Sequence, residues 1–236
     1  MRVAAVGDIH CRREAAGTVA PLLAPVNDLA DVLLLCGDLT DYGLLDEAHV
    51  LVKELSAVKV PMIAVLGNHD VESGHAEDVT RMLSEAGVHM LDGEECVVQG
   101  VGFAGVKGFI GGFGRGTLGP WGEPIVKRFV QEAIDEALKL ESALSRLRTE
   151  RRVVLMHYAP IRETVQGEPV EIFAYLGCSR LAEPLGRLPV DVVFHGHAHH
   201  GTAEGVTATG VPVFNVALPL MKQTFPEGPP LRVYEL

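Results

Sequence analysis

Five short polar clusters in this 236-residue sequence contain side chains that bind metal ions. Each cluster follows an apolar run that predicts a strand. Together they hold seven candidate ligands: Asp8, His10, Asp38, Asn68, His157, His197 and His199. Carboxylate, amide and imidazole donors without thiolate suit first-row ions such as Mn, Fe, Zn, Co or Ni. Because seven ligands exceed the needs of one four-coordinate ion, they predict two divalent or mixed-valence ions that share a carboxylate.

The spacing within the clusters indicates which side chains act together. In an extended segment, residues two apart point the same way, so Asp8 should share a face with His10, and His197 with His199. The neighbours Asn68 and His69 should diverge and have different roles. Paired ions would activate a water and neutralise charge on a phosphoryl group, with a nearby imidazole as general acid.

Each cluster also has a simpler interpretation. Gly-Asp after a strand is a common turn, Asn-His-Asp suits a helix cap, and a single histidine such as His157 is often part of the core. The occurrence of all five clusters, each after an apolar run, favours one functional site over five unrelated turns.

The elements that would position these clusters alternate between strand and helix. Apolar runs at 3–6, 32–36 and 62–66 predict buried strands, and the pattern at 44–55 predicts a helix. Such alternation predicts right-handed crossovers and a largely parallel sheet. The carboxyl ends of parallel strands meet at one edge of a sheet, so the clusters should converge there.

The rest of the chain predicts further strands and helices without internal repeats. We expect helices at 76–86 and 124–148, with an exposed glycine-rich loop at 100–122. Short segments at 88–91, 97–98 and 101–106 resemble antiparallel strands. Later strands are expected at 153–156, 190–194, 211–216 and 231–234. The whole chain, residues 1–236, is expected to form one domain.

Composition excludes several classes of protein. Hydrophobic residues make up 47% and charged residues 22%, which excludes a disordered chain. The net charge of −11 argues against binding duplex nucleic acid but permits a small phosphorylated substrate if cations are bound. No apolar run approaches the roughly 18 residues of a membrane span. Without a signal-peptide or Cys-x-x-Cys pattern, we expect a cytoplasmic protein, and the sequence carries no signal for its oligomeric state.

The order of the motifs resembles a known superfamily. The chain has Gly-Asp-x-His at 7–10, Gly-Asp at 37–38, Gly-Asn-His-Asp at 67–70, a single histidine at 157 and Gly-His-x-His at 196–199. This series is similar to that of the calcineurin-like metallophosphoesterases. The resemblance implies a four-layer α/β/β/α sandwich with two mixed sheets and a dinuclear metal site at the carboxyl ends of the strands.

The resemblance also implies roles for the motif residues. Asp8, His10 and His199 would hold one ion, and Asn68, His157 and His197 the other. Asp38 would bridge the two ions. His69 would protonate the leaving oxygen or stabilise the transition state, and Asp70 would orient His69.

The implied activity is metal-dependent hydrolysis of phosphate esters, in which a hydroxide bridging the ions attacks phosphorus. Monoester and diester substrates both remain open, as does a nuclease acting on short or single-stranded nucleic acid. A non-catalytic interaction module, like a retromer subunit that shares this fold, is the alternative from another class. Arg115, in the glycine-rich 108–119 region, is a candidate contact for a substrate phosphate, although a mobile surface loop without a role is the favoured interpretation.

Overall fold

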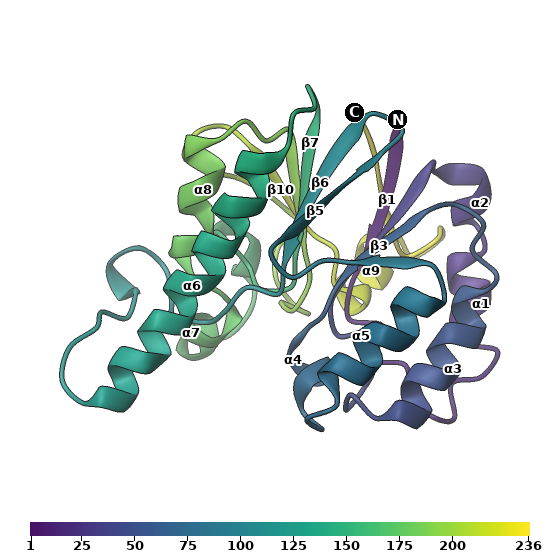
Figure 1. Cartoon of the computed structure of the whole chain (residues 1–236), viewed down its shortest axis with the longest axis horizontal. Coiled ribbons are helices and arrows are strands. Elements are labelled where there is room, and N and C mark those ends of the chain that lie inside the picture. Colours follow the sequence, from purple (N-terminus) through teal and green to yellow (C-terminus); the bar gives the residue numbers. More distant parts are fainter.

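Two β-sheets packed face to face form the centre of the molecule, and helices cover both outer faces (Figure 1). The computed structural model describes all residues, 1–236. The strand order is β11-β1-β2-β3-β4 in the first sheet and β5-β6-β7-β8-β10-β9 in the second. Each sheet combines parallel central strands with at least one antiparallel edge strand. The predicted α/β/β/α sandwich with two mixed sheets is confirmed.

The strands are short and mostly buried. Their bounds are β1 Arg2–Val6, β2 Val32–Cys36, β3 Met62–Val65, β4 Val88–Met90, β5 Glu94–Val98, β6 Val101–Val106, β7 Arg152–Met156, β8 Val192–His195, β9 Glu204–Val206, β10 Pro212–Asn215 and β11 Arg232–Glu235. The helices are α1 Val19–Leu23, α2 Val26–Leu29, α3 Leu45–Leu55, α4 Asn68–Val71, α5 Ala76–Glu85, α6 Pro124–Arg146, α7 Phe173–Leu176, α8 Ala182–Arg187 and α9 Leu218–Thr224.

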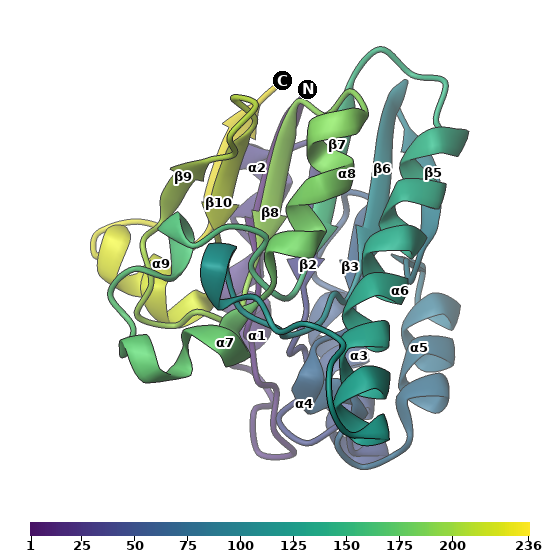
Figure 2. The same ribbon diagram turned by 90° about the vertical axis from the view of Figure 1, so that its left-hand side faces the viewer.

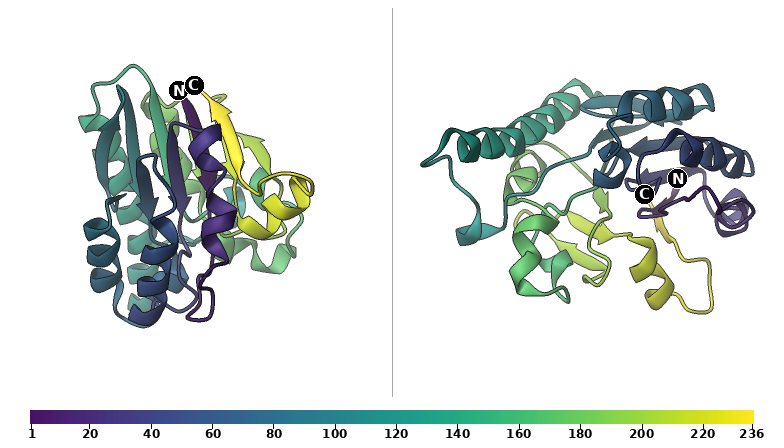
Figure 3. Two further views of the ribbon diagram at one scale, coloured as in Figure 1. Left: turned by 90° about the vertical axis from the view of Figure 1, so that its right-hand side faces the viewer. Right: turned by 90° about the horizontal axis from the view of Figure 1, so that it is seen from below.

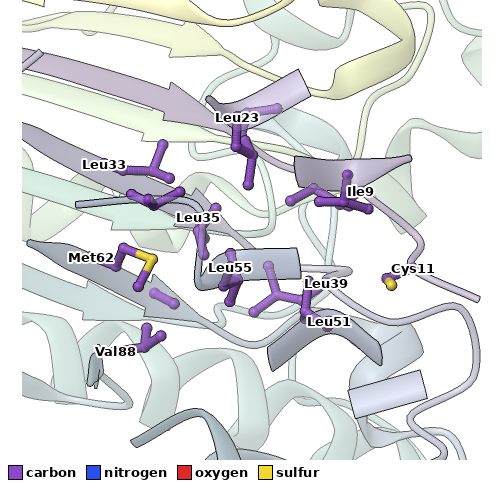
Figure 4. Close-up of a cluster of buried hydrophobic side chains, with 14 of the residues drawn as sticks. Ile9, Cys11, Leu23, Leu33, Leu35, Leu39, Leu51, Leu55, Met62 and Val88 are labelled. Atoms are coloured by element: carbon purple, nitrogen blue, oxygen red, sulfur yellow. The ribbon is translucent and has the colours of Figure 1, made fainter. Parts of the chain in front are cut away.

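Unbroken hydrophobicity in the central strands follows from burial on both faces. In β2, Leu33 and Leu35 belong to the cluster that packs under the helices of the first sheet, which Figure 4 shows in part. Leu34, between them, belongs to a second cluster between the two sheets. Alternation therefore places successive apolar side chains of one strand in two different cores.

The second sheet is covered by α6 and α8 (Figure 2). Pro124 opens α6, where its missing N–H costs nothing, and the helix packs Leu140 and Leu144 against the sheet. The opposite face of the molecule carries α1, α2 and α3 against the first sheet (Figure 3, left). No helix combines the length and the apolar character that crossing a bilayer requires.

Two sequence expectations about strands are wrong in detail. β4 pairs parallel to β3, because α5 lies between them and supplies the crossover that a parallel connection needs. β6 pairs antiparallel to β5 but parallel to β7, and all six of its residues are buried. Gly102 and Gly105 therefore belong to a central strand, where their lack of a side chain allows close packing, and the glycine-rich loop begins after β6.

Candidate metal centre

The loops after five strands meet at one end of the sandwich. β1 leads to Asp8, β2 to Asp38, β3 to Asn68, β7 to His157 and β8 to the 197–199 segment. Figure 3 (right) views the molecule from this end. The carboxyl ends of strands from both sheets thus supply the site.

Left-handed backbone conformations direct these side chains. Asp8, His10, Asp38 and His197 have φ of 56°, 46°, 49° and 71°. Only one other non-glycine residue, Gln99, has a positive φ. Residues with a Cβ seldom adopt this region, and such strain is concentrated at functional sites. The expectation that 8–10 and 197–199 are extended is therefore wrong, although each segment still directs two side chains into the site.

Glycines next to the ligands allow the loops to approach closely. A Cβ at Gly67 would overlap the Asp38 carboxylate, and one at Gly196 would overlap the Asp8 carboxylate. The glycines before Asn68 and His197 are thus required by the short distance between loops.

All seven predicted ligands come together. Ligand atoms within 4.8 Å of one another form two overlapping groups that share Asp8, which are Asp8–Asp38–His157–His197 and Asp8–His10–His199. The Asn68 Oδ1 lies 2.9 Å from His157 Nε2 and so joins the first group. A third group, His10–Asp38–His69, shares Asp38 with the first. Both carboxylates therefore lie between the histidines, where a bridging ligand would have to be.

The donor set fits bound cations. Both ring nitrogens of His10 are buried without a hydrogen-bond partner, an arrangement that costs free energy unless something else occupies the lone pair. Asp8 and Asp38 are only 2% and 1% exposed, and neither pairs with a lysine or arginine. Buried carboxylates need compensating positive charge, which metal ions would supply.

Burial controls the protonation of these groups. Burial and the charges of nearby carboxylates raise the pKa of Asp38 to about 7. Burial also disfavours the charged form of Asp8, but the hydrogen bond from His199 and the charges of nearby imidazoles outweigh it and hold the pKa of Asp8 at about 2. Burial lowers the pKa of His197 to about 3 and also lowers that of His157. Both imidazoles are therefore neutral near pH 7, the form that binds metal.

Backbone carbonyls orient two of the imidazoles. His157 donates Nδ1–H to the Cys36 carbonyl at 3.0 Å, so its Nε2 faces the centre. His197 donates Nε2–H to the Tyr175 carbonyl at 3.0 Å, so its Nδ1 faces the centre. Such outer contacts fix the tautomer of a metal-binding histidine.

His69 belongs to the third group and contacts partners different from those of Asn68. Its backbone N–H donates to Asp38 Oδ1 at 2.9 Å, and its Nδ1 donates to the Asp41 carbonyl at 2.6 Å. This leaves Nε2 without a protein partner. Burial disfavours the charged ring, but the Asp41 carbonyl and the charges of Asp38 and Glu72 outweigh it and raise the pKa of His69.

The Asp70 carboxylate makes no hydrogen bond to the His69 ring, so it does not orient that ring in the way the family resemblance implied. This fully buried carboxylate accepts hydrogen bonds from the backbone N–H groups of Leu39, Thr40 and Gly67 and from the Thr40 hydroxyl, at 2.6–3.1 Å. Asp70 thus joins the loop after β2 to the loop after β3. Because these loops carry Asp38 and Asn68, Asp70 fixes the distance between two candidate ligands.

Asp41 is the residue that sequence reasoning missed. Its carbonyl holds His69, and its Oδ1 lies 3.4 Å from His10 Nδ1. Arg12 approaches the same carboxylate, with Nε 2.9 Å from Oδ2. The available signal was a second aspartate three residues after Asp38. The contact of the Tyr175 carbonyl had no such signal, because every residue has a backbone carbonyl.

Arg115 remains a prediction. It lies in an exposed 3₁₀ turn, Gly114–Gly116, and its side chain makes no hydrogen bond or ion pair. No contact in the structure connects it to the ligand groups.

Comparisons with known proteins agree with this geometry. The calcineurin-like phosphoesterase family model matches residues 1–201. No curated protein matches this chain. Among solved structures, phosphopantetheinyl hydrolase from Mycobacterium tuberculosis superposes with a TM-score of 0.70 at 16% identity, covering 98% of this chain and 95% of its own.

Two larger proteins share the fold over part of their length. A putative 5'-nucleotidase from Staphylococcus aureus has a TM-score of 0.57 at 17% identity, covering 91% of this chain and 48% of its own. A purple acid phosphatase from yellow lupin has a TM-score of 0.56 at 12% identity, covering 92% and 43%. At these identities the structures establish the fold alone, whereas the family model spans most of the sequence. The chain belongs to the calcineurin-like phosphoesterase family.

Proposed function

We propose that this protein is a metal-dependent hydrolase of phosphate esters that uses two ions. The observation that carries the proposal is the convergence of seven oxygen and nitrogen ligands, two of them buried carboxylates, with an unpartnered imidazole nitrogen beside them. When bound, the ions would activate a water molecule and neutralise charge on the phosphoryl oxygens. The protein's own part is to hold the ions and to manage the leaving group.

The ligands divide between two positions in the proposal. His10 and His199, with Asp8, would hold one ion, and Asn68, His157 and His197 would hold the other. Asp38 would contact both, in keeping with its place in two of the three ligand groups. Asp8 also belongs to two groups, and its two oxygens accept hydrogen bonds from the His197 backbone N–H, which fixes the carboxylate between the two groups.

His69 would act as the general acid. Hydrolysis forms a P–O bond from water and breaks the ester P–O bond, and the departing oxygen needs a proton. The Asp41 carbonyl holds the Nδ1–H, so a doubly protonated ring offers its proton from Nε2 and keeps the favoured tautomer afterwards. The raised pKa of His69 favours the protonated form that this step needs.

The substrate would be a small phosphorylated molecule, either a monoester or a diester. The net charge of −11 would repel a long polyanion, so positive charge would have to come from the ions and a few side chains such as Arg12 or Arg115. The solved structures with this fold include proteins named as a phosphopantetheinyl hydrolase, a nucleotidase and a phosphatase. A substrate panel should therefore include aryl monophosphates, bis-aryl phosphates and nucleotides.

Elemental analysis and hydrolysis assays on matched variants test the proposal. Asp38→Asn and His157→Ala should lose metal and activity together, whereas His69→Ala should keep the metal and lose rate, typically 10²–10⁴-fold for a general acid. His49→Ala serves as control, because His49 is exposed on α3 and bonds only to a carbonyl of its own helix. Metal-free protein that hydrolyses phosphate esters as fast as the metal-loaded protein would contradict the proposal.

A further inference from the structure

An apolar groove is connected to the candidate metal centre through one residue, Tyr175, which lines the groove and whose carbonyl accepts a hydrogen bond from His197. The groove has a volume of ≈ 420 Å³, and no charged side chain lines it. The glycine-rich loop, the first turns of α6 and the short helix α7 form its walls, and Figure 2 shows the loop running between α7 and α6. The side chains that line it are Leu118, Ile125, Val126, Phe129, Ala174 and Tyr175.

The first turns of α6 contribute little to the core. The buried residues of α6 begin at Val130, whereas Ile125 in the first turn is 63% exposed. Tyr175, which lines the groove, is 62% exposed, and Trp121, four residues before Ile125 in the chain, is 63% exposed. Exposed apolar surface gathered around a concavity marks a binding site rather than a packing requirement.

The groove walls are tied to each other and to the metal centre. Gly111 donates its N–H to the Ala174 carbonyl at 3.0 Å, and Gly112 donates to the Gly177 carbonyl at 2.9 Å. The glycine-rich loop and α7 therefore form one unit. The Tyr175 carbonyl accepts the hydrogen bond from His197 Nε2, so a residue that lines the groove directly contacts a candidate ligand.

We propose that this groove binds an apolar alkyl or aryl group of the substrate, which makes esters with an apolar organic part the preferred substrate class. The inference rests on the proposed function, because the phosphate must sit at the metal centre for its substituent to reach the groove. The lining favours this occupant: it offers no cation for a second phosphate and no carboxylate for an amine. Its contact with the centre through Tyr175 favours part of the substrate over a separate protein partner.

Inhibition by a series of n-alkylphosphonates, from methyl to octyl, tests the groove without depending on which ester bond breaks. Each methylene that enters the groove should lower the inhibition constant about fourfold, until the groove is filled. The single tryptophan, Trp121, gives a second readout, since its fluorescence should change on binding of octylphosphonate and less on binding of methylphosphonate.

In Ile125→Ser, the ratio of the inhibition constants of methylphosphonate and octylphosphonate should be at least fivefold smaller than in the wild type. The inhibition constant of methylphosphonate itself should be unchanged. Val97→Ser is the matched control, because Val97 is 57% exposed on β5 and does not line the groove. Inhibition that does not depend on chain length, in protein that hydrolyses phosphate esters, would overturn the groove assignment and leave the proposed function intact. Loss of a dimer in Ile125→Ser with unchanged chain-length dependence would also overturn it, in favour of a second copy of this chain.

Failure of the proposed function would give a different result. A protein that hydrolyses no phosphate ester with any metal, but whose Trp121 fluorescence still responds to octylphosphonate in the wild type and not in Ile125→Ser, would contradict the hydrolase assignment while supporting the groove. The two failures are therefore distinguishable in one set of proteins.

Discussion

Replacing Asp70 by asparagine should destabilise the protein through the hydrogen bonds that join two ligand-bearing loops. The Asp70 carboxylate accepts four hydrogen bonds, from Leu39 and Gly67 at Oδ2 and from the backbone and hydroxyl of Thr40 at Oδ1. Asparagine has nearly the same shape, but one of its two terminal atoms is a donor. Two of the four donors must then face an N–H₂ group.

The less costly orientation places the amide nitrogen toward Thr40. The Thr40 hydroxyl can rotate to accept a hydrogen bond, whereas the Thr40 backbone N–H is left without a partner, at about 1–3 kcal/mol. The bonds from Leu39 and Gly67 lose their charged acceptor, which weakens each by about 1 kcal/mol. We therefore expect Asp70→Asn to lower the free energy of unfolding by about 3–5 kcal/mol, a large part of the stability of an ordinary domain.

Urea unfolding of metal-free protein measures this free energy without a contribution from bound ions. Asp135→Asn on the exposed face of α6 is the control and should stay within about 0.5 kcal/mol of the wild type. If Asp70→Asn does not fold, Thr40→Val, which removes one donor to Asp70 and the acceptor of the Gly43 N–H, should show a loss of about 1–3 kcal/mol. An Asp70→Asn protein as stable as the wild type, with unchanged metal content, would refute the role assigned to Asp70.

Three further predictions concern metal and local structure. Chelation should lower the unfolding free energy by about 4 kcal/mol if free metal is at roughly 1,000 times its dissociation constant, as measured by thermal unfolding with and without chelator. Gly67→Ala should abolish metal binding because its Cβ would overlap the Asp38 carboxylate, whereas Gly228→Ala, which meets open space, should not; elemental analysis distinguishes them. Glu54 accepts hydrogen bonds from the backbone N–H groups that begin α1, and these hold its pKa below the ordinary value. Its contribution is therefore present above the unfolded pKa of about 4.3 and lost as pH falls, so the stability gap between wild type and Glu54→Gln should close in acid; an equal gap at pH 3 and pH 7 would contradict this.

The sequence predicts most individual strands and helices because they depend on local patterns, whereas the stacking of two sheets followed only from the resemblance to the family. Unbroken apolar runs such as Val32–Cys36 can form only where both faces of a strand are covered, and the period of Pro124–Arg146 defines a long amphipathic helix. The pairing direction of β4 could not be predicted from a local pattern. It depends on the path of α5 across the sheet, and a three-residue strand carries too short a pattern to reveal its pairing.

The sequence identifies the candidate ligands but not the groups that orient them. Aspartate and histidine at strand ends are chemically distinctive, so their identity alone marks them. The contacts that orient them come from backbone groups, such as the Cys36 and Tyr175 carbonyls, which every residue possesses. Asp70 is a further case: the resemblance implied that it orients His69, but α4 directs its carboxylate toward the backbone of Leu39 and Thr40.

The metal-free site combines several unfavourable features that a bound cation would relieve. Four of its residues have left-handed backbone conformations, each costing about 1–2 kcal/mol, and their sum is comparable to the net stability of a domain. Two carboxylates lie buried close together, which raises the pKa of Asp38 to about 7, and the His10 ring nitrogens lack hydrogen bonds. Cations would neutralise the two carboxylates and accept a lone pair from His10. These bonds would also stabilise the loops that hold the strained residues. The stability gained on metal binding should therefore depend on His10 and Asp38 as much as on the other ligands.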